Sequence, residues 1–217
     1  MFVQRHPVEA LALLTFFLLF AFPIHEFAHA LAAYRLGDST AKLFGKLTLD
    51  PIAHFDRIGG TMLVISVLVA GFPFGFAQTP VNPRNLRGRY GDVIVSLAGP
   101  LSNLLMAAAV AIPLRLLFPL TAGDQTIYVT EPELVLKLIV QYSILLGLFN
   151  LIPVPPLDGG AVLLSLLPPR IAWQVRPFLA QYGLFILILL IFPIAGESVV
   201  AKLLSPIVDV VYDVLVG

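Results

Sequence analysis

The chain of 217 residues is 59% hydrophobic and only 12% charged, and its mean hydropathy is +0.94. This composition excludes a soluble domain of this size and predicts a polytopic membrane protein embedded in the lipid bilayer. Basic and acidic side chains balance to a net charge of zero, which argues against a nucleic-acid partner because phosphate binding requires clustered Lys and Arg. The absence of cysteine excludes disulfides and thiolate ligands, so any zinc site must use His, Asp or Glu.

The first apolar segment, from about 8 to 35, is long enough as a helix to cross a bilayer. Its second half contains the HExxH pattern His25-Glu26-Phe27-Ala28-His29. Residues four apart share a helix face, so the two imidazoles can bind one zinc ion, and Glu26 is placed to accept a proton from water. Because ionisable groups inside membrane segments are functional by default, the segment predicts a metal site.

Two further features of this segment have alternative interpretations. Pro23 removes a backbone donor just before the motif and should bend the helix, either as an ordinary kink or to open the site. The apolar run of 10–22, followed by the small residues of 28–30, also resembles a signal peptide with its cleavage site. The apolar pattern continues to Leu36, and cleavage would sever the motif, so we expect a retained membrane helix.

A polar stretch from 37 to 57 follows the first segment. Short apolar and polar alternation over 41–49 predicts a small β-hairpin with Gly45 near its turn. His54 stands alone in this stretch, and we interpret it as a surface or structural residue, not as a metal ligand.

The second apolar segment, from about 58 to 77, ends in a proline-interrupted connector over 78–89 that cannot be a membrane helix. The connector contains three Arg, and the polar stretch of 37–57 is also basic. The positive-inside rule would place both loops in the cytoplasm. If the apolar segment between them spans the membrane, however, the two loops must lie on opposite sides of it. One loop or the segment itself is therefore expected to be re-entrant or interfacial, and the orientation stays open.

The third segment, from about 92 to 118, contains Gly99-Pro100-Leu101-Ser102-Asn103. Gly-Pro inside a membrane helix frees backbone groups, and the amide of Asn103 must find a partner within the bundle. A packing kink explains this pattern as well as a role in an active site does.

A fourth segment, from about 134 to 151, leads into a proline-rich stretch that ends at Asp158 and two glycines. The prolines force extended backbone, and a short helix is expected over 159–167. Asp158 is then either the N-cap of this helix or a metal ligand. Irregular polar backbone between apolar segments is tolerated only where it is buried in protein or lines a wet cavity, so a site is expected here.

The rest of the chain contains an apolar span over 178–194 and an amphipathic segment over 199–215 that fits either the interface or a crossing. The predicted fold is therefore all-α and polytopic, with about six membrane segments, a small hairpin, and re-entrant or broken segments around a buried zinc site. We expect one domain over 1–217, with a catalytic core at about 7–167 and C-terminal helices at about 174–216.

A catalytic zinc ion normally has three protein ligands, so the two histidines need a third. Among the acidic residues, Asp158 alone combines an apolar setting, a forced backbone and glycines that allow close approach. The HExxH motif together with the N-x-x-P-x-x-x-L-D-G pattern of 150–159 resembles the site-2 proteases, intramembrane zinc metalloproteases, and in particular their small subgroup without PDZ or CBS domains. The stretch 76–79 departs from that subgroup, many of whose members have a Lys there.

The resemblance implies one zinc ion per chain and a role for each matching residue: zinc ligands His25, His29 and Asp158, general base Glu26, and substrate or oxyanion contacts from Asn150 and Asn103. It also implies regulated intramembrane proteolysis of single-span membrane proteins, in a multi-pass protein of a prokaryotic cell membrane that can form homo-oligomers. The hairpin at 41–49 would bind the unwound substrate by edge addition.

Two rival functions use the same residues differently. An inactive zinc-binding scaffold would keep the ligands for structure, but it does not need the base Glu26 beside the metal. An ion or metal transporter would use the intramembrane His and Asp as a relay, but the sequence has no internal repeat. The intact motifs therefore favour the protease.

Overall fold

The computed structural model describes residues 7–54, 61, 65, 79–118, 130–192 and 198–217, and this part of the chain contains helices and no strand. The elements are α2 (Pro7–Phe16), η1 (Phe17–Ala21), α3 (Phe22–Arg35), α4 (Thr40–Leu43), α5 (Pro51–His54), η2 (Pro83–Asn85), α7 (Gly91–Leu117), α8 (Glu131–Asn150), α9 (Asp158–Leu166), α10 (Pro169–Ile191) and α11 (Val199–Val216).

Four helical segments in the described residues are long and apolar enough to cross a bilayer: Ala10–Arg35, Gly91–Leu117, Glu131–Asn150 and Pro169–Ile191. They correspond to the first, third, fourth and fifth segments expected from the sequence. The second expected segment, 58–77, lies outside the described residues apart from isolated positions. α10 begins earlier than the expected span at 178, because hydropathy marks only its apolar half while Pro169 starts the helix.

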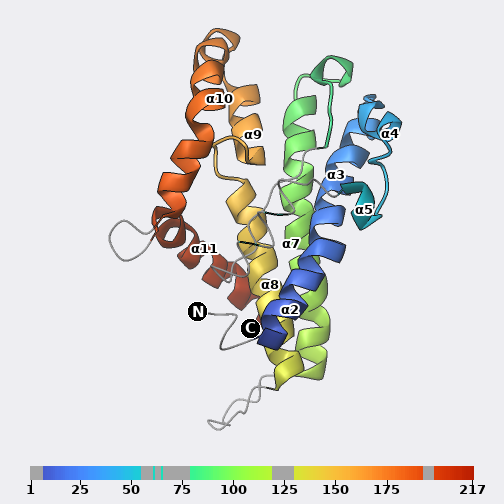
Figure 1. Cartoon of the computed structure of the whole chain (residues 1–217), viewed down its shortest axis with the longest axis vertical. Helices are drawn as coiled ribbons and strands as arrows, with labels where there is room; N and C mark the ends of the chain where they lie inside the picture. Colours follow the sequence, from blue (N-terminus) through green and yellow to red (C-terminus); the bar gives the residue numbers. More distant parts are fainter. Residues whose placement is uncertain (1–6, 55–60, 62–64, 66–78, 119–129, 193–197) are drawn as a thin grey trace.

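α7 is the central helix, since it packs against α3, α8 and α9. Figure 1 shows α3, α7 and α8 side by side, with α9 and α10 as a second pair at the upper left. α2 extends the line of α3 and packs against α8. This arrangement brings the HExxH helix and the start of α9, which are far apart in the sequence, onto the same central helix.

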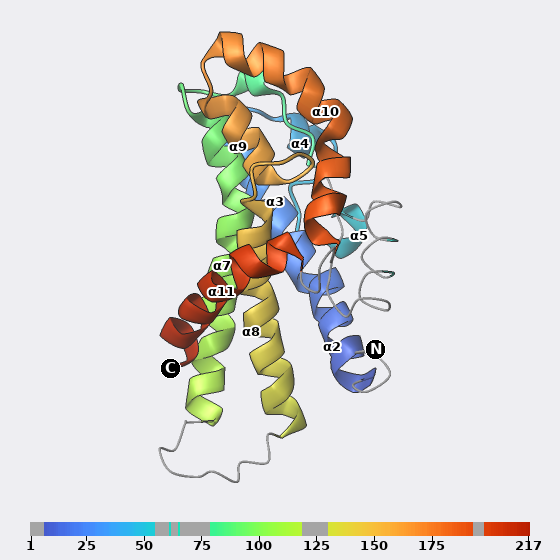
Figure 2. The ribbon, with the colours of Figure 1, turned by 90° about the vertical axis from the view of Figure 1, so that its left-hand side faces the viewer.

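α11 lies across α8 and α7 (Figure 2) and covers the larger apolar core of the bundle. Its buried residues Val200, Leu204 and Val208 recur every four positions, while Lys202 and Asp209 are exposed. The amphipathic helix expected over 199–215 is thereby confirmed. It is not one of the four candidate spans in the described residues, and the two alternatives of lying in the interface or crossing the membrane remain predictions.

The first segment changes its hydrogen-bond pattern just before Pro23. Five residues, 17–21, form a π-helical turn in which the Phe22 N–H donates to the Phe17 carbonyl. Pro23 has no N–H and its ring crowds the preceding turn, so the regular ladder cannot continue unchanged through this point. The predicted disturbance of the helix before the motif is confirmed.

The β-hairpin expected over 41–49 is wrong, because these residues form the one-turn helix α4 and turns. The Thr40 N–H and hydroxyl both donate to Asp38 Oδ1, which starts the helix. Gly45, at φ 70°, ends it in a Schellman motif in which the Lys46 N–H donates to the Ala41 carbonyl. The glycine that suggested a hairpin turn is a helix C-terminus, and 41–49 offer no strand edge to a substrate.

Candidate metal centre

Asp158 is presented to the bundle by a tight loop. A Cβ on Gly159 would collide with the Leu151 carbonyl, and one on Gly160 would lie 2.5 Å from the Pro155 nitrogen. The two glycines therefore let the proline-rich loop fold back onto the start of α9. Asp158 is the first residue of that helix and makes no capping bond, while Leu157 occupies the N-cap. The N-cap interpretation of Asp158 is therefore wrong.

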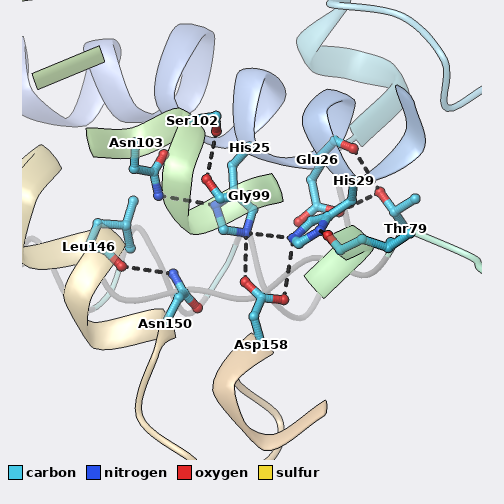
Figure 3. Close-up of polar contacts among 11 residues, drawn as sticks. His25, Glu26, His29, Thr79, Gly99, Ser102, Asn103, Leu146, Asn150 and Asp158 are labelled. Atoms are coloured by element: carbon cyan, nitrogen blue, oxygen red, sulfur yellow. Dashed lines mark hydrogen bonds and ion pairs between the residues drawn. The ribbon is translucent and has the colours of Figure 1, made fainter. Parts of the chain in front are cut away.

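The side chains of His25, His29 and Asp158 converge on one point (Figure 3). The two Nε2 atoms are 3.0 Å apart, His25 Nε2 lies 3.2 Å from Asp158 Oδ2, and His29 Nε2 lies 3.3 Å from Asp158 Oδ1. Ligand atoms about 2.0–2.1 Å from a tetrahedral zinc ion are about 3.3–3.4 Å apart. The separations here involve both oxygens of Asp158 and are equal to or slightly shorter than those of a zinc site, so the three side chains are close enough to share one ion. Within the described residues, Asp158 Oδ2 is buried without a hydrogen-bond partner, as expected of an atom that faces a cation.

The second ring nitrogen of each histidine has its own partner from α7. His29 Nδ1 lies 2.7 Å from the Val95 carbonyl oxygen, which can only accept, so Nδ1 carries the proton and Nε2 presents a lone pair. His25 Nδ1 lies 3.0 Å from the side-chain nitrogen of Asn103. Outer partners of this kind orient metal-binding imidazoles and fix their tautomers.

Gly99 of α7 provides the space for both imidazoles. A Cβ at this position would lie 2.6 Å from His25 Nε2 and closer still to His29 Nε2. Such contacts are shorter than real Cβ atoms make, so any other residue would displace the rings or occupy the space between the ligand atoms. Gly99 therefore has a direct role at the site, in addition to any effect on helix packing.

Glu26 is 4% exposed, and its carboxylate accepts a hydrogen bond of 2.6 Å from the Thr79 hydroxyl. Thr79 belongs to the connector before η2, so this bond joins α3 to a segment 53 positions further along the chain. Figure 3 shows Thr79 on the side of Glu26 away from Asn103. The hydrogen bond holds the carboxylate in one orientation beside the ligand group.

The connector is in turn fastened to the end of α3 by Asp38. This carboxylate is fully buried and accepts from the Asn82 N–H at 2.7 Å, the Asn85 side-chain nitrogen at 2.9 Å, and the Thr40 N–H and hydroxyl. Burial by itself raises the pKa of Asp38, but these hydrogen bonds outweigh it and hold the pKa below its ordinary value. We call Asp38 with Thr40, Asn82 and Asn85 the connector clamp.

A cavity of about 320 Å³ opens beside the ligand group. Glu26, His29 and Asp158 line it together with residues of the connector, α7, α9 and α10. Its polar lining includes Asp92, Ser96, Ser165 and Arg176, which can hydrogen-bond water. The volume is at the lower end of the range of small-molecule sites, enough for a short stretch of extended peptide.

The remaining predicted residues lie in different surroundings. Asn103 touches His25 but does not line the cavity, within the described residues. Asn150, at the end of α8, donates from its side-chain nitrogen to the Leu146 carbonyl of its own helix at 3.0 Å. His54 is buried and its Nε2 lies 2.6 Å from the Thr48 carbonyl, which confirms a structural residue and rejects a surface one.

Thr79, Asp38 and the Val95 carbonyl were missed by reasoning from the sequence. The departure from the subgroup pattern at 76–79 was the only signal for Thr79, and it did not indicate a contact with Glu26. Asp38 was one of several acidic residues in a polar stretch, and a backbone carbonyl has no sequence signature. Gly99 was noticed, but its role required the position of the imidazoles.

Comparison with known proteins finds a peptidase family model and relatives named as zinc metalloproteases. A family model described as "Peptidase family M50" matches residues 116–190, a range that includes Asp158. A Bacillus subtilis (strain 168) protein named "Putative zinc metalloprotease YwhC" is 36% identical over 202 residues, which cover 92% of this chain and 89% of that protein.

Two mycobacterial relatives share the name "Putative zinc metalloprotease Rip2". The protein of Mycolicibacterium smegmatis is 33% identical over 173 residues, covering 77% of this chain and 62% of the relative. The protein of Mycobacterium tuberculosis (strain H37Rv) is 32% identical over 173 residues, covering 78% and 63%. This chain thus corresponds to less than two thirds of either Rip2 protein. No solved structure is significantly similar to the chain.

Proposed function

Because the chain belongs to peptidase family M50, the site-2 protease family, we propose that it is a zinc metalloprotease that cleaves membrane proteins within or near their transmembrane segments. The proposed setting is regulated intramembrane proteolysis, carried out by a multi-pass protein of a bacterial cell membrane. The four apolar helices and the Bacillus relative support this setting. The proposed protease domain comprises the whole chain, with the catalytic core at about 7–167.

The observation that carries the proposal is the convergence of three ligand atoms beside a buried carboxylate that lines the same cavity. His25, His29 and Asp158 would hold one zinc ion, and a fourth position would stay open toward the cavity. A purely structural site would instead be closed by a fourth protein ligand, which the described residues do not supply. Glu26 at the cavity wall favours catalysis over a scaffold role.

A bound zinc ion supplies Lewis-acid chemistry, acidifying a water molecule and polarising a peptide carbonyl. Glu26 accepts the proton of the attacking water on its carboxylate and later donates it to the nitrogen of the leaving amine. The Thr79 hydroxyl holds that carboxylate toward the cavity while the proton is transferred. Asn150 contributes a substrate contact through its amide oxygen or its second N–H, because only one of its two N–H groups donates to the Leu146 carbonyl.

The substrate must reach the site as extended backbone, because the carbonyls of a helix are occupied by its own hydrogen bonds. The polar residues of the cavity, Asp92, Ser96, Ser165 and Arg176, supply the wet path that hydrolysis requires. The cavity is lined by the connector and by residues of α3, α7, α9 and α10, and we assign it to the unwound segment of a single-span substrate.

The experiment compares the purified full chain with its Glu26→Gln variant. Both proteins should bind one zinc ion, because Glu26 is not a ligand. Only the wild type should cleave members of a panel of single-span membrane proteins in proteoliposomes, with the variant slower by about 10²- to 10⁴-fold. A chelator should stop cleavage and added zinc should restore it. Equal cleavage by both proteins, or cleavage that resists chelation, would refute the proposal.

A further inference from the structure

The side chain of Asn103 is fully buried in α7, and one end of its amide has no partner. Its nitrogen lies 3.0 Å from His25 Nδ1, while its Oδ1 makes no hydrogen bond within the described residues. An unpaired buried acceptor destabilises the fold, so this amide points to a function that offsets its cost.

Asn103 contacts the back of the ligand set (Figure 3). It touches Nδ1 of His25, whereas Asp158 and His29 face Nε2 on the opposite edge of the same ring. Asn103 is 0% exposed and is not one of the residues that line the cavity. A group in this place cannot touch a substrate carbonyl in the cavity without passing through the imidazole.

The two histidines differ in how their tautomers are set. The Val95 carbonyl can only accept, so it forces the proton of His29 onto Nδ1 and leaves the Nε2 lone pair for a cation. His25 has no such carbonyl, and its Nδ1 faces an amide that can donate through its nitrogen or accept through its oxygen. With the nitrogen toward the ring, the proton of His25 would sit on Nε2, among the three ligand atoms.

We propose that Asn103 is a positioning residue for His25. The side-chain oxygen of Asn103 accepts a hydrogen bond from the Nδ1–H of His25 and thereby fixes the histidine tautomer that binds zinc. Amide oxygen and nitrogen exchange places by a half-turn of the side chain, and either orientation leaves one amide atom unpaired. The number of hydrogen bonds therefore does not distinguish the two amide orientations. Zinc binding requires a lone pair on His25 Nε2, and only the orientation with the Asn103 oxygen toward Nδ1 provides it. This inference rests on the proposed zinc site and replaces the substrate or oxyanion role expected for Asn103 from the sequence.

The test measures zinc affinity of the full chain in detergent, by competition with a chromophoric chelator. Asn103→Leu keeps the approximate size but cannot accept, and it should weaken zinc binding about 10- to 100-fold. Asn103→Asp retains an acceptor on either side and should bind zinc within a few-fold of the wild type. Asn150→Leu is the contrasting variant: its amide bonds the Leu146 carbonyl and no zinc ligand, so zinc affinity should be unchanged while cleavage falls through the lost substrate contact.

Each outcome decides the proposal. If Asn103→Leu binds zinc as tightly as the wild type while cleavage falls, Asn103 acts on the substrate and the inference is wrong. It is also wrong if Asn103→Asp loses zinc as severely as Asn103→Leu. Should the leucine variant not fold, as judged by its thermal midpoint, Asn103→Ala takes its place with the same expected loss. Failure of the wild type to bind zinc would instead refute the zinc site on which the proposed function depends.

Discussion

Replacing Gly99 by alanine should abolish the metal site with a single methyl group. The added Cβ would lie 2.6 Å from His25 Nε2, whereas ordinary van der Waals contact begins at 3.4 Å. The ring would have to retreat by the difference, 3.4 − 2.6 = 0.8 Å, and the His29 ring by more. Metal–ligand distances tolerate only about 0.2 Å of error, so both nitrogens would leave bonding range together.

The expected effect is loss of zinc at modest cost to the fold. Overpacking by one methyl group destabilises a core by about 1–3 kcal/mol, which the bundle should survive. Zinc affinity should fall by about 100-fold or more, because changing an outer partner of a ligand costs about 10- to 100-fold and here both rings are displaced. Cleavage of membrane substrates should fall with it, and excess zinc should only partly restore it.

The assay is bound zinc per chain after gel filtration, together with the thermal midpoint in detergent. Gly147→Ala is the matched control, since its Cβ would also be crowded, 3.0 Å from the Pro100 carbonyl, but at the contact between α8 and α7, with Pro100 and Leu104 and not the imidazoles as its nearest neighbours. The control should lose stability and keep its zinc. Wild-type zinc affinity in Gly99→Ala would show that the rings are not confined by α7, and would refute the reasoning.

Two further predictions concern the connector. Thr79→Val removes the hydroxyl that holds Glu26 and should lower kcat about 3- to 10-fold, the effect of losing one hydrogen bond, while the zinc content stays unchanged. Thr79→Ser keeps a hydroxyl and should restore kcat. If it does not, Thr79 acts through packing and not through this hydrogen bond. Asp38→Asn should destabilise the connector clamp by about 2 kcal/mol. Because the folded-state pKa of Asp38 is lowered, its stabilisation is present above the unfolded pKa of about 4 and is lost as pH falls through the folded value. The thermal midpoints of wild type and Asp38→Asn should therefore converge in acid, and a constant difference would contradict this account.

The four described membrane helices could be predicted because a long apolar run has few alternatives in a bilayer, where every backbone group must be bonded within its own segment. The stretch 41–49 could not, because it is short and mixes apolar with polar residues. There the buried carboxylate of Asp38 and the positive φ of Gly45 outweigh a weak alternation pattern. Element type was thus decided by hydropathy in the apolar segments. In the loop it was decided by the backbone of Gly45 and by the hydrogen bonds of Asp38, which is buried because Asn82 and Asn85, 44 and 47 positions further along the chain, also bond to it.

The features of the candidate site likewise fall into those that the sequence determines and those that the tertiary structure determines. Helix periodicity by itself places His25 and His29 on one face with Glu26 between them, and the lack of cysteine with the forced loop singles out Asp158. Only the tertiary structure decided what surrounds these residues: the space at Gly99, the carbonyl of Val95, the hydroxyl of Thr79 and the side of His25 on which Asn103 lies. The physical reason is the separation along the sequence of the residues in contact. Two ligands four residues apart follow from one helical turn. Their supporting contacts join segments 53 to 78 positions apart, which meet only when α7 and the connector pack against α3.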